Sequence, residues 1–123
     1  MKKILAIFLL LISSQVLAYW TLSSEEVGVK YYYDSERINK QGRYIDLWYL
    51  INLPSKNKYG DRSAVSKMRV DCQSLRTKIL SNFSYKKSMG RGSPRVSNKV
   101  ADKNWSSIPS RSHLMTAIKK ICS

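Results

Sequence analysis

The sequence predicts a single α+β domain: one antiparallel β-sheet of about five to six strands, followed by a C-terminal α-helix that a disulfide tethers to the sheet. Three observations support this prediction. Segments with the period-2 alternation of β-strands follow one another up to residue 100. The last residues carry an apolar stripe at helical spacing. The two cysteines are Cys72, within the predicted sheet, and Cys122, within the predicted helix.

Residues 1–18 have the layout of a secretory signal peptide. Two lysines follow Met1, residues 4–12 are all apolar, and Val16-Leu17-Ala18 predicts cleavage after Ala18. The apolar run is too short to cross a bilayer, and the alternative is a buried N-terminal helix. No cysteine lies at the cleavage site. We therefore expect an exported protein, periplasmic, secreted or held at the cell surface, that is not a lipoprotein, with residues 19–123 as its one domain.

The cysteine pair favours a disulfide in an exported protein. A bond between Cys72 and Cys122 would close a loop of about 50 residues, which chain-entropy models value at about 4 kcal/mol. Two free buried thiols are the alternative. The two cysteines and the lone His113 lack the close spacing of zinc ligands. Neither a metal nor another cofactor is predicted.

The first predicted element is a hairpin, in which strands 19–22 and 27–34 flank a polar turn at 23–26. Tyrosines at 31–33 allow two interpretations: a stacking platform for a sugar or peptide, or a face that is half core and half solvated. Residues 35–43 are predicted to be a loop that contains a turn glycine.

Residues 44–53 form the strongest predicted strand. Its two faces are Ile45, Leu47, Tyr49, Ile51 and Leu53 on one side, and Tyr44, Asp46, Trp48, Leu50 and Asn52 on the other. Because apolar residues occur on both faces, we expect a central strand that is covered on both sides for part of its length. Pro54 ends it, and residues 55–62 form a polar, basic loop.

Two more strands are predicted at 63–72 and 75–85. Their apolar residues alternate out of phase, so a bulge or bend is expected near Gln73-Ser74. Residues 96–100 are predicted to form a short edge strand, and Trp105 is predicted to fill a gap in the core.

The terminal helix is predicted to start near Pro109, Ser110 or Ser112, residues that suit a first turn. Its apolar stripe consists of Leu114, Met115, Ala117, Ile118, Ile121 and Cys122. Lys119 and Lys120 complement the helix dipole in the last turn. We expect the stripe to pack on the sheet, and docking on a membrane is the alternative.

The chain is strongly basic. Its formal net charge is +14, and loss of the two lysines in residues 1–18 leaves +12. Such a surface attracts polyanions, unless the charge serves only solubility. The glycine-rich loop 86–95 is the candidate ligand-binding site, although an ordinary solvated hairpin tip is the alternative, and it lacks the phosphate-loop pattern. The candidate residues are Lys86, Lys87, Arg91 and Arg95.

No catalytic constellation is recognisable in the sequence. His113 is the only histidine, and it is expected at the surface near the start of the helix. The carboxylates are few and scattered, and Asp71 is interpreted as the ion-pair partner of an arginine. The sequence therefore predicts a protein that is not an enzyme, with a small hydrolase as a remote alternative.

Several residues in a fixed order match a known family. They are Trp20, Tyr31-Tyr32-Tyr33-Asp34, Gly42, Trp48, Asp71-Cys72, Trp105 and Cys122. With this pattern, residues 19–123 resemble the surface-adhesin protein E family of small exported bacterial proteins. The resemblance implies an antiparallel sheet with a disulfide-tethered helix. It also implies binding of host extracellular-matrix or serum proteins.

The chain departs from the family at Ala18-Tyr19, because the family's namesake is lipid-anchored and no lipidation cysteine is present here. Two functions follow. The first is an exported, non-enzymatic binding protein that uses a basic surface to bind host proteins or other macromolecules. The alternative is a periplasmic partner-binding protein that recognises an acidic protein or an envelope polyanion and has no role in host adhesion.

Overall fold

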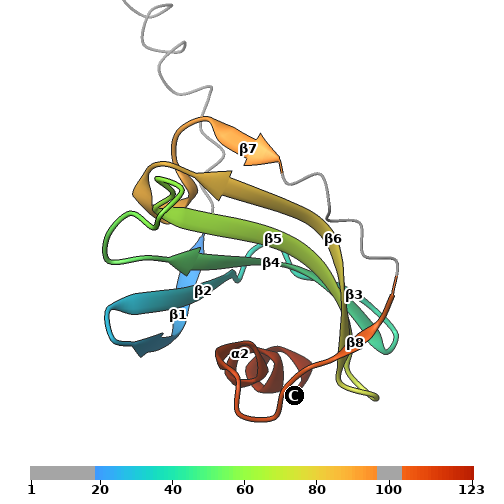
Figure 1. Ribbon diagram of the computed structural model, residues 1–123. Coiled ribbons are helices and arrows are strands. Elements are labelled where there is room, and N and C mark those ends of the chain that lie inside the picture. The colour runs from blue at the N-terminus through green and yellow to red at the C-terminus, as the bar shows by residue number, and fades with distance from the viewer. Residues whose placement is uncertain (1–18, 97–103) are drawn as a thin grey trace, which may run out of the picture.

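The computed structural model describes residues 19–96 and 104–123, in which eight antiparallel strands form one sheet that curves around a single helix, α2 (Figure 1). The predicted signal peptide, residues 1–18, lies outside the described residues. The strand order is β1-β2-β4-β5-β6-β7, with β3 paired to β4 and β8 to β6. The strands are β1 (Trp20–Glu26), β2 (Val29–Asp34), β3 (Asn39–Gln41), β4 (Tyr44–Asn52), β5 (Ser63–Asp71), β6 (Arg76–Tyr85), β7 (Pro94–Val96) and β8 (Ser106–Ser107).

The predicted fold class is confirmed in its antiparallel sheet and tethered helix, but the sheet is larger than five to six strands. The two strands that were not predicted are β3, expected to be part of a loop, and β8. Strands of three and two residues are too short to show alternation in the sequence. They are recognised only by their pairing, β3 with β4 and β8 with β6. Of the predicted edge strand 96–100, Val96 belongs to β7 and the rest lies outside the described residues.

The predicted N-terminal hairpin is present, but its turn is displaced. Residues 23–26 belong to β1, and the turn lies at Val27-Gly28, where φ is +50° and +80°. Two consecutive residues with positive φ match the twist of a two-residue hairpin turn. The polar residues 23–26 mimic a turn in the sequence because β1 is an edge strand with little apolar alternation.

The prediction of a bulge near Gln73-Ser74 is wrong. Residues 72–75 form the turn between β5 and β6, and the Leu75 N–H donates to the Asp71 carbonyl at 2.8 Å. The register shift lies farther along, where Lys67 pairs with Ser81 and Met68 with Ile79. Leu80 is therefore the extra residue, and it brings the two halves of β6 into phase with the faces of the sheet.

Helix α2 (His113–Cys122) packs its apolar stripe on the inner face of the sheet, as predicted. The helix begins after Ser112, whose hydroxyl accepts a hydrogen bond from the Met115 N–H at 3.1 Å. Ile118 is fully buried. The core residues are Ile45, Leu47, Tyr49, Met68, Val70, Ile108, Met115, Ala117, Ile118 and Ile121. Within residues 19–96 and 104–123, no helix is long and apolar enough to cross a membrane.

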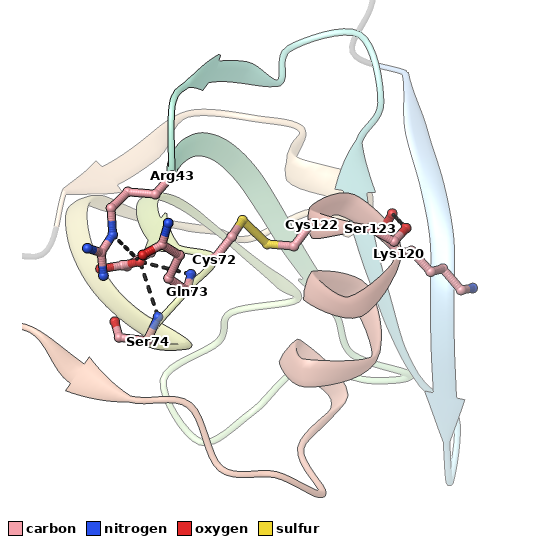
Figure 2. The surroundings of a disulfide bond; sticks show 8 residues. Arg43, Cys72, Gln73, Ser74, Lys120, Cys122 and Ser123 are labelled. Carbon is pink, nitrogen blue, oxygen red and sulfur yellow. Dashed lines mark hydrogen bonds and ion pairs between the residues drawn. A yellow bond between two sulfur atoms is a disulfide. The ribbon is translucent and has the colours of Figure 1, made fainter.

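The disulfide between Cys72 and Cys122 is present and ties the end of α2 to the β5–β6 turn (Figure 2). Cys72 is the residue after β5, and the two Cα atoms lie 5.6 Å apart. Beside it, the Asp71 carboxylate accepts from Arg43 Nε at 2.9 Å and Nη2 at 2.7 Å (Figure 2). This confirms the interpretation of Asp71 as an ion-pair partner.

The outer face of the sheet is the face opposite α2, and one end of it is covered as well. Leu50 and Val65 point to this side and are buried, with 0% and 5% exposure. The 3₁₀ turn η1 (Ser88–Gly90) lies over them, so close that a Cβ on Gly90 would come within 3.1 Å of Val65 Cγ2. The expected two-sided covering of the central strand is therefore confirmed at this end of β4.

Candidate functional site

The basic loop predicted to bind a ligand is attached firmly to the domain at its centre. The Met89 N–H donates to Asn52 Oδ1 at 2.8 Å, and the Gly90 N–H donates to Ser63 Oγ at 2.9 Å. Ser63 Oγ in turn donates to the Lys87 carbonyl at 2.7 Å. These bonds link the loop to β4 and β5. Residues 86–95 have the composition of a solvated hairpin tip, but their centre is a turn that packs on the sheet.

The four cations of this loop are exposed but do not converge. Arg95 lies in β7 and forms an ion pair with the buried Asp61. Arg91 donates to the carbonyl and hydroxyl oxygens of Ser88. Lys86 and Lys87 are exposed. The loop therefore offers solvated positive charge, and its role in binding stays a prediction.

A second basic region, which was not predicted from the sequence, covers the open part of the outer face. Cationic and aromatic side chains from β4, β5 and β6 alternate there with residues from two connecting segments. We call this region the cation–aromatic surface and define it as Arg37, Tyr44, Asp46, Trp48, Lys67, Arg69, Lys78 and Trp105.

Trp48 is the centre of one half of the cation–aromatic surface. Arg37 Cζ lies 4.8 Å and Lys67 Nζ 5.7 Å from the indole centroid, within the range of cation–π attraction. Arg37 is held in place by the fully buried Asp34, whose Oδ2 accepts from Nε at 2.6 Å. Phe83 supports the indole from β6 at 6.3 Å between centroids.

Tyr44 and Trp105 form the other half. Their ring centroids lie 5.8 Å apart, and Lys78 Nζ lies 5.8 Å from the centroid of the Trp105 ring. Arg43 Cζ lies 5.7 Å from the ring of Tyr44. The prediction that Trp105 fills the core is wrong, because the residue packs on the outer side of β4, opposite the core. A polar run ending in tryptophan cannot indicate which face it covers.

Two ion pairs organise the charges of this face. Asp46 Oδ1 and Oδ2 accept from Arg69 Nε and Nη2 at 2.7 and 3.0 Å, which lowers the pKa of Asp46. The Arg43 guanidinium, aided by the N–H groups of Ser74 and Gln73, lowers the pKa of Asp71. Among the described residues, no carboxylate lies within ion-pair distance of Lys67 or Lys78, although Lys67 is near enough to Asp46 to help lower the pKa of that carboxyl. The ammonium groups of both lysines can therefore contact a ligand.

Two hollows lie on this surface, one in each half. The larger, of about 330 Å³, is lined by Glu36, Arg37, Ile38, Asn39, Asp46, Trp48 and Lys67. The smaller, of about 180 Å³, is lined by Gln41, Tyr44, Arg69 and Trp105. Both linings combine aromatic rings with charged and amide groups, which suits a polar ligand.

His113 is half-buried at the start of α2 and does not lie free at the surface as expected. Its Nδ1 lies 2.9 Å from Ser24 Oγ and its Nε2 2.6 Å from Glu26 Oε2. The ring is thus committed to joining α2 to β1. In the part of the chain that the structure describes, no three metal-ligating side chains gather.

The tyrosines at 31–33 divide between the two faces. Tyr31 and Tyr33 pack against the core under α2, whereas Tyr32 pairs with Leu50 on the outer side. The interpretation as a half-core, half-solvated face is the one that the structure supports. The outward alternation of Tyr44 and Trp48 in β4 was the signal in the sequence that pointed to the cation–aromatic surface.

Comparisons with known proteins agree with this fold. The family described as surface-adhesin protein E matches residues 20–123. One crystal form of Haemophilus influenzae protein E is similar with a TM-score of 0.71 and 19% identity, over 88% of this chain and 90% of that one. A second structure of that protein is similar with a TM-score of 0.66 and 20% identity, over 88% of this chain and 86% of that one. The structure of protein E from non-typeable Haemophilus influenzae has a TM-score of 0.64 and 18% identity, over 89% of this chain and 78% of that one. No curated protein matches the sequence.

Proposed function

Because the chain belongs to the surface-adhesin protein E family, we propose that it is an exported, non-enzymatic binding protein that holds an acidic macromolecule on its cation–aromatic surface. The observation that carries the proposal is the pair of lysines, Lys67 and Lys78. Each lies beside a tryptophan and, among the described residues, has no carboxylate within ion-pair distance. The arginines of this surface are paired with carboxylates, Arg37 with Asp34 and Arg69 with Asp46, so the two lysines supply its unpaired positive charge.

The net charge supports the same partner class. A charge of +14 on 123 residues, or +12 without Lys2 and Lys3, raises the local concentration of anionic partners and speeds their association. In the family's adhesin role, the partner is a host extracellular-matrix or serum protein. The exposed cations of the loop, Lys86, Lys87, Arg91 and Arg95, are proposed as a second contact region for it.

A periplasmic role is the alternative function. The specific observation in its favour is the predicted cleavage after Ala18 with no cysteine beside it, which would leave the processed protein without a lipid anchor. The same surface would then bind an acidic protein or an envelope polyanion. Labelling of intact cells separates the two, because an adhesin is accessible there and a periplasmic protein is not.

The binding test uses the protein expressed from its full sequence and purified with its disulfide intact. Its affinity for immobilised host matrix proteins, serum proteins and envelope extract is compared with that of a Lys67→Ala/Lys78→Ala variant. The control is Lys119→Ala/Lys120→Ala, which removes the same charge from the exposed last turn of α2. We expect the first variant to lose about tenfold or more in affinity and the control to stay near wild type.

Equal loss in both variants would show that net charge alone drives adhesion and would contradict a specific surface. A separate variant with alanine at all four loop cations tests the second contact region. Its binding is expected to weaken and to become less sensitive to salt, since exposed charges are screened over about 8 Å at physiological ionic strength. Normal binding by this variant would remove the loop from the proposal.

A further inference from the structure

The two halves of the cation–aromatic surface repeat one arrangement. In each, a lysine from a neighbouring strand lies beside a tryptophan: Lys67 at 5.7 Å from Trp48, and Lys78 at 5.8 Å from Trp105. Tyr44, which contacts Trp105, precedes Trp48 by four residues on the same face of β4, a separation of about 14 Å. The two units are therefore spaced along an extended line.

Between the two units lies a polar centre. Asp46 and Arg69 face each other across β4 and β5 in a two-bond ion pair, and each lines one of the two hollows. Because this pair satisfies its own charges, it offers further hydrogen bonds without adding net charge. A ligand that crosses the surface thus meets an aromatic ring and a cation, then a neutral polar pair, then an aromatic ring and a cation again.

We propose that this surface binds an anionic polysaccharide, a chain of sugar rings that carry carboxylate or sulfate groups. The inference rests on the proposed function and names the chemical class of the ligand. Sugar rings have apolar C–H faces that pack on aromatic rings, and their anionic substituents pair with lysine and arginine. The repeat of both features along such a chain corresponds to the repeat of tryptophan and lysine along the surface.

The lining of the hollows favours a sugar over an acidic peptide. Glu36 and Asn39 in the larger hollow, and Gln41 in the smaller, can exchange hydrogen bonds with hydroxyl groups. The carboxylate of Glu36 can accept hydrogen bonds from sugar hydroxyl groups, whereas the ionised side chains of an acidic peptide offer it no donor. The hot spots of protein–protein interfaces usually lie in well-packed apolar pockets, whereas the only large hydrophobic side chain exposed on this surface, among the described residues, is Tyr44.

The test measures binding by isothermal titration calorimetry with three soluble polymers: heparin, uncharged dextran and polyglutamate. We expect heparin to bind saturably, dextran not to bind, and polyglutamate to bind at least about tenfold more weakly than heparin at equal concentration of anionic groups. Heparin binding should weaken as salt rises.

Three variants assign the binding to residues. Lys67→Ala/Lys78→Ala should weaken heparin binding about tenfold or more, and Lys119→Ala/Lys120→Ala should leave it unchanged. Tyr44→Ala should weaken heparin binding but not the residual binding of polyglutamate, because it removes an aromatic surface and no charge. Thermal melts confirm that each variant is folded. Amide NMR shifts of the wild type on heparin addition should centre on residues 44–48 and spare 119–120, which keeps the test informative if Tyr44→Ala fails to fold.

Three results would overturn the inference. If polyglutamate binds as tightly as heparin, the surface recognises negative charge without distinguishing sugar from peptide, and an acidic protein segment becomes the better ligand. If no polysaccharide binds while a matrix or envelope protein still binds through Lys67 and Lys78, the ligand class is wrong and the proposed function stands. If the Lys67→Ala/Lys78→Ala variant binds every partner normally, both the proposed function and the inferred ligand class are wrong.

Discussion

His113 stacks face to face on Tyr31, with ring centroids 4.1 Å apart and planes inclined by 8°. The same imidazole contacts Ser24 and Glu26 of β1 through its two nitrogens. Since His113 is the first residue of α2 and Cys122 the last, the helix is fastened to the sheet at both ends. Two side-chain links of different chemistry therefore hold the terminal element over the core.

The histidine link should contribute measurably to stability. We expect His113→Ala to lower the free energy of unfolding by about 1–2 kcal/mol, because it removes a ring contact and two hydrogen bonds that are partly exposed. Chemical denaturation of the oxidised protein measures this, with Arg111→Ala at an exposed neighbouring position as the control. An effect no larger than that of the control would mean that the stacked geometry adds nothing to the fold.

The disulfide should contribute more than the histidine. Replacing both cysteines by serine frees a loop with a sequence separation of 50, for which chain-entropy models give about 4 kcal/mol. We expect the melting temperature to fall strongly, while the sheet is still formed at low temperature. Circular dichroism measures both. Intact-mass analysis after alkylation, with and without reductant, checks the bond itself. Free thiols in the non-reduced protein would contradict the structure.

The stripe of α2 should be a core element and not a binding face. Ile118 is fully buried, so Ile118→Asp would bury an unpaired carboxylate in addition to losing packing, at a cost of about 4 kcal/mol or more. We expect the domain to unfold or to melt far below wild type. Lys119→Asp, the exposed neighbour, is the control and should melt close to wild type. An unchanged melting temperature for Ile118→Asp would show that the helix is not packed as described.

Gly90 should be sensitive to a single methyl group. Its φ is +67°, and an added Cβ would lie 3.1 Å from Val65 Cγ2 and 3.3 Å from Leu50 Cδ1. Gly42 has a similar φ of +63° with no atom within 4 Å of such a Cβ. Gly42→Ala should therefore cost only the backbone strain, about 1–2 kcal/mol, whereas Gly90→Ala should cost about 1–3 kcal/mol more. Equal effects in denaturation would mean that η1 is not packed on the sheet.

The Asp46 and Asp71 ion pairs make stability depend on acid pH. Their pKa values are lowered in the folded protein, first by the hydrogen bonds from Arg69 and Arg43 respectively. Their contribution is thus complete above the unfolded-state pKa of about 4 and is lost as pH falls through the folded-state values. We expect the melting temperature to fall below about pH 4, and to fall less steeply in Asp71→Asn, although this variant is less stable at neutral pH. A parallel pH profile in the variant would contradict the assignment.

Much of the architecture follows from local sequence patterns. The alternation in residues 44–52 placed β4 and its two faces, and the stripe from Leu114 to Ile121 placed α2. The lone cysteine pair, in a chain predicted to be exported, predicted the bond between Cys72 and Cys122. These features depend on spacings of two, three and four residues, or on a count of cysteines. The same spacings place apolar side chains on one face of a strand or helix, and burial of that face stabilises the fold. The pattern and the fold therefore agree.

Local patterns in the sequence are enough to predict an antiparallel sheet, a terminal helix and an excess of positive charge. Which of the positive charges form a common surface depends on how the strands pair. Trp105 and Tyr44 are 61 positions apart, and Lys67 reaches Trp48 from another strand, so no local spacing relates them. The loop 86–95 concentrated cations in the sequence, yet its turn is bonded to Asn52 and Ser63. Strand register sets which side chains meet across the sheet, and register is fixed by the burial of the whole inner face at once.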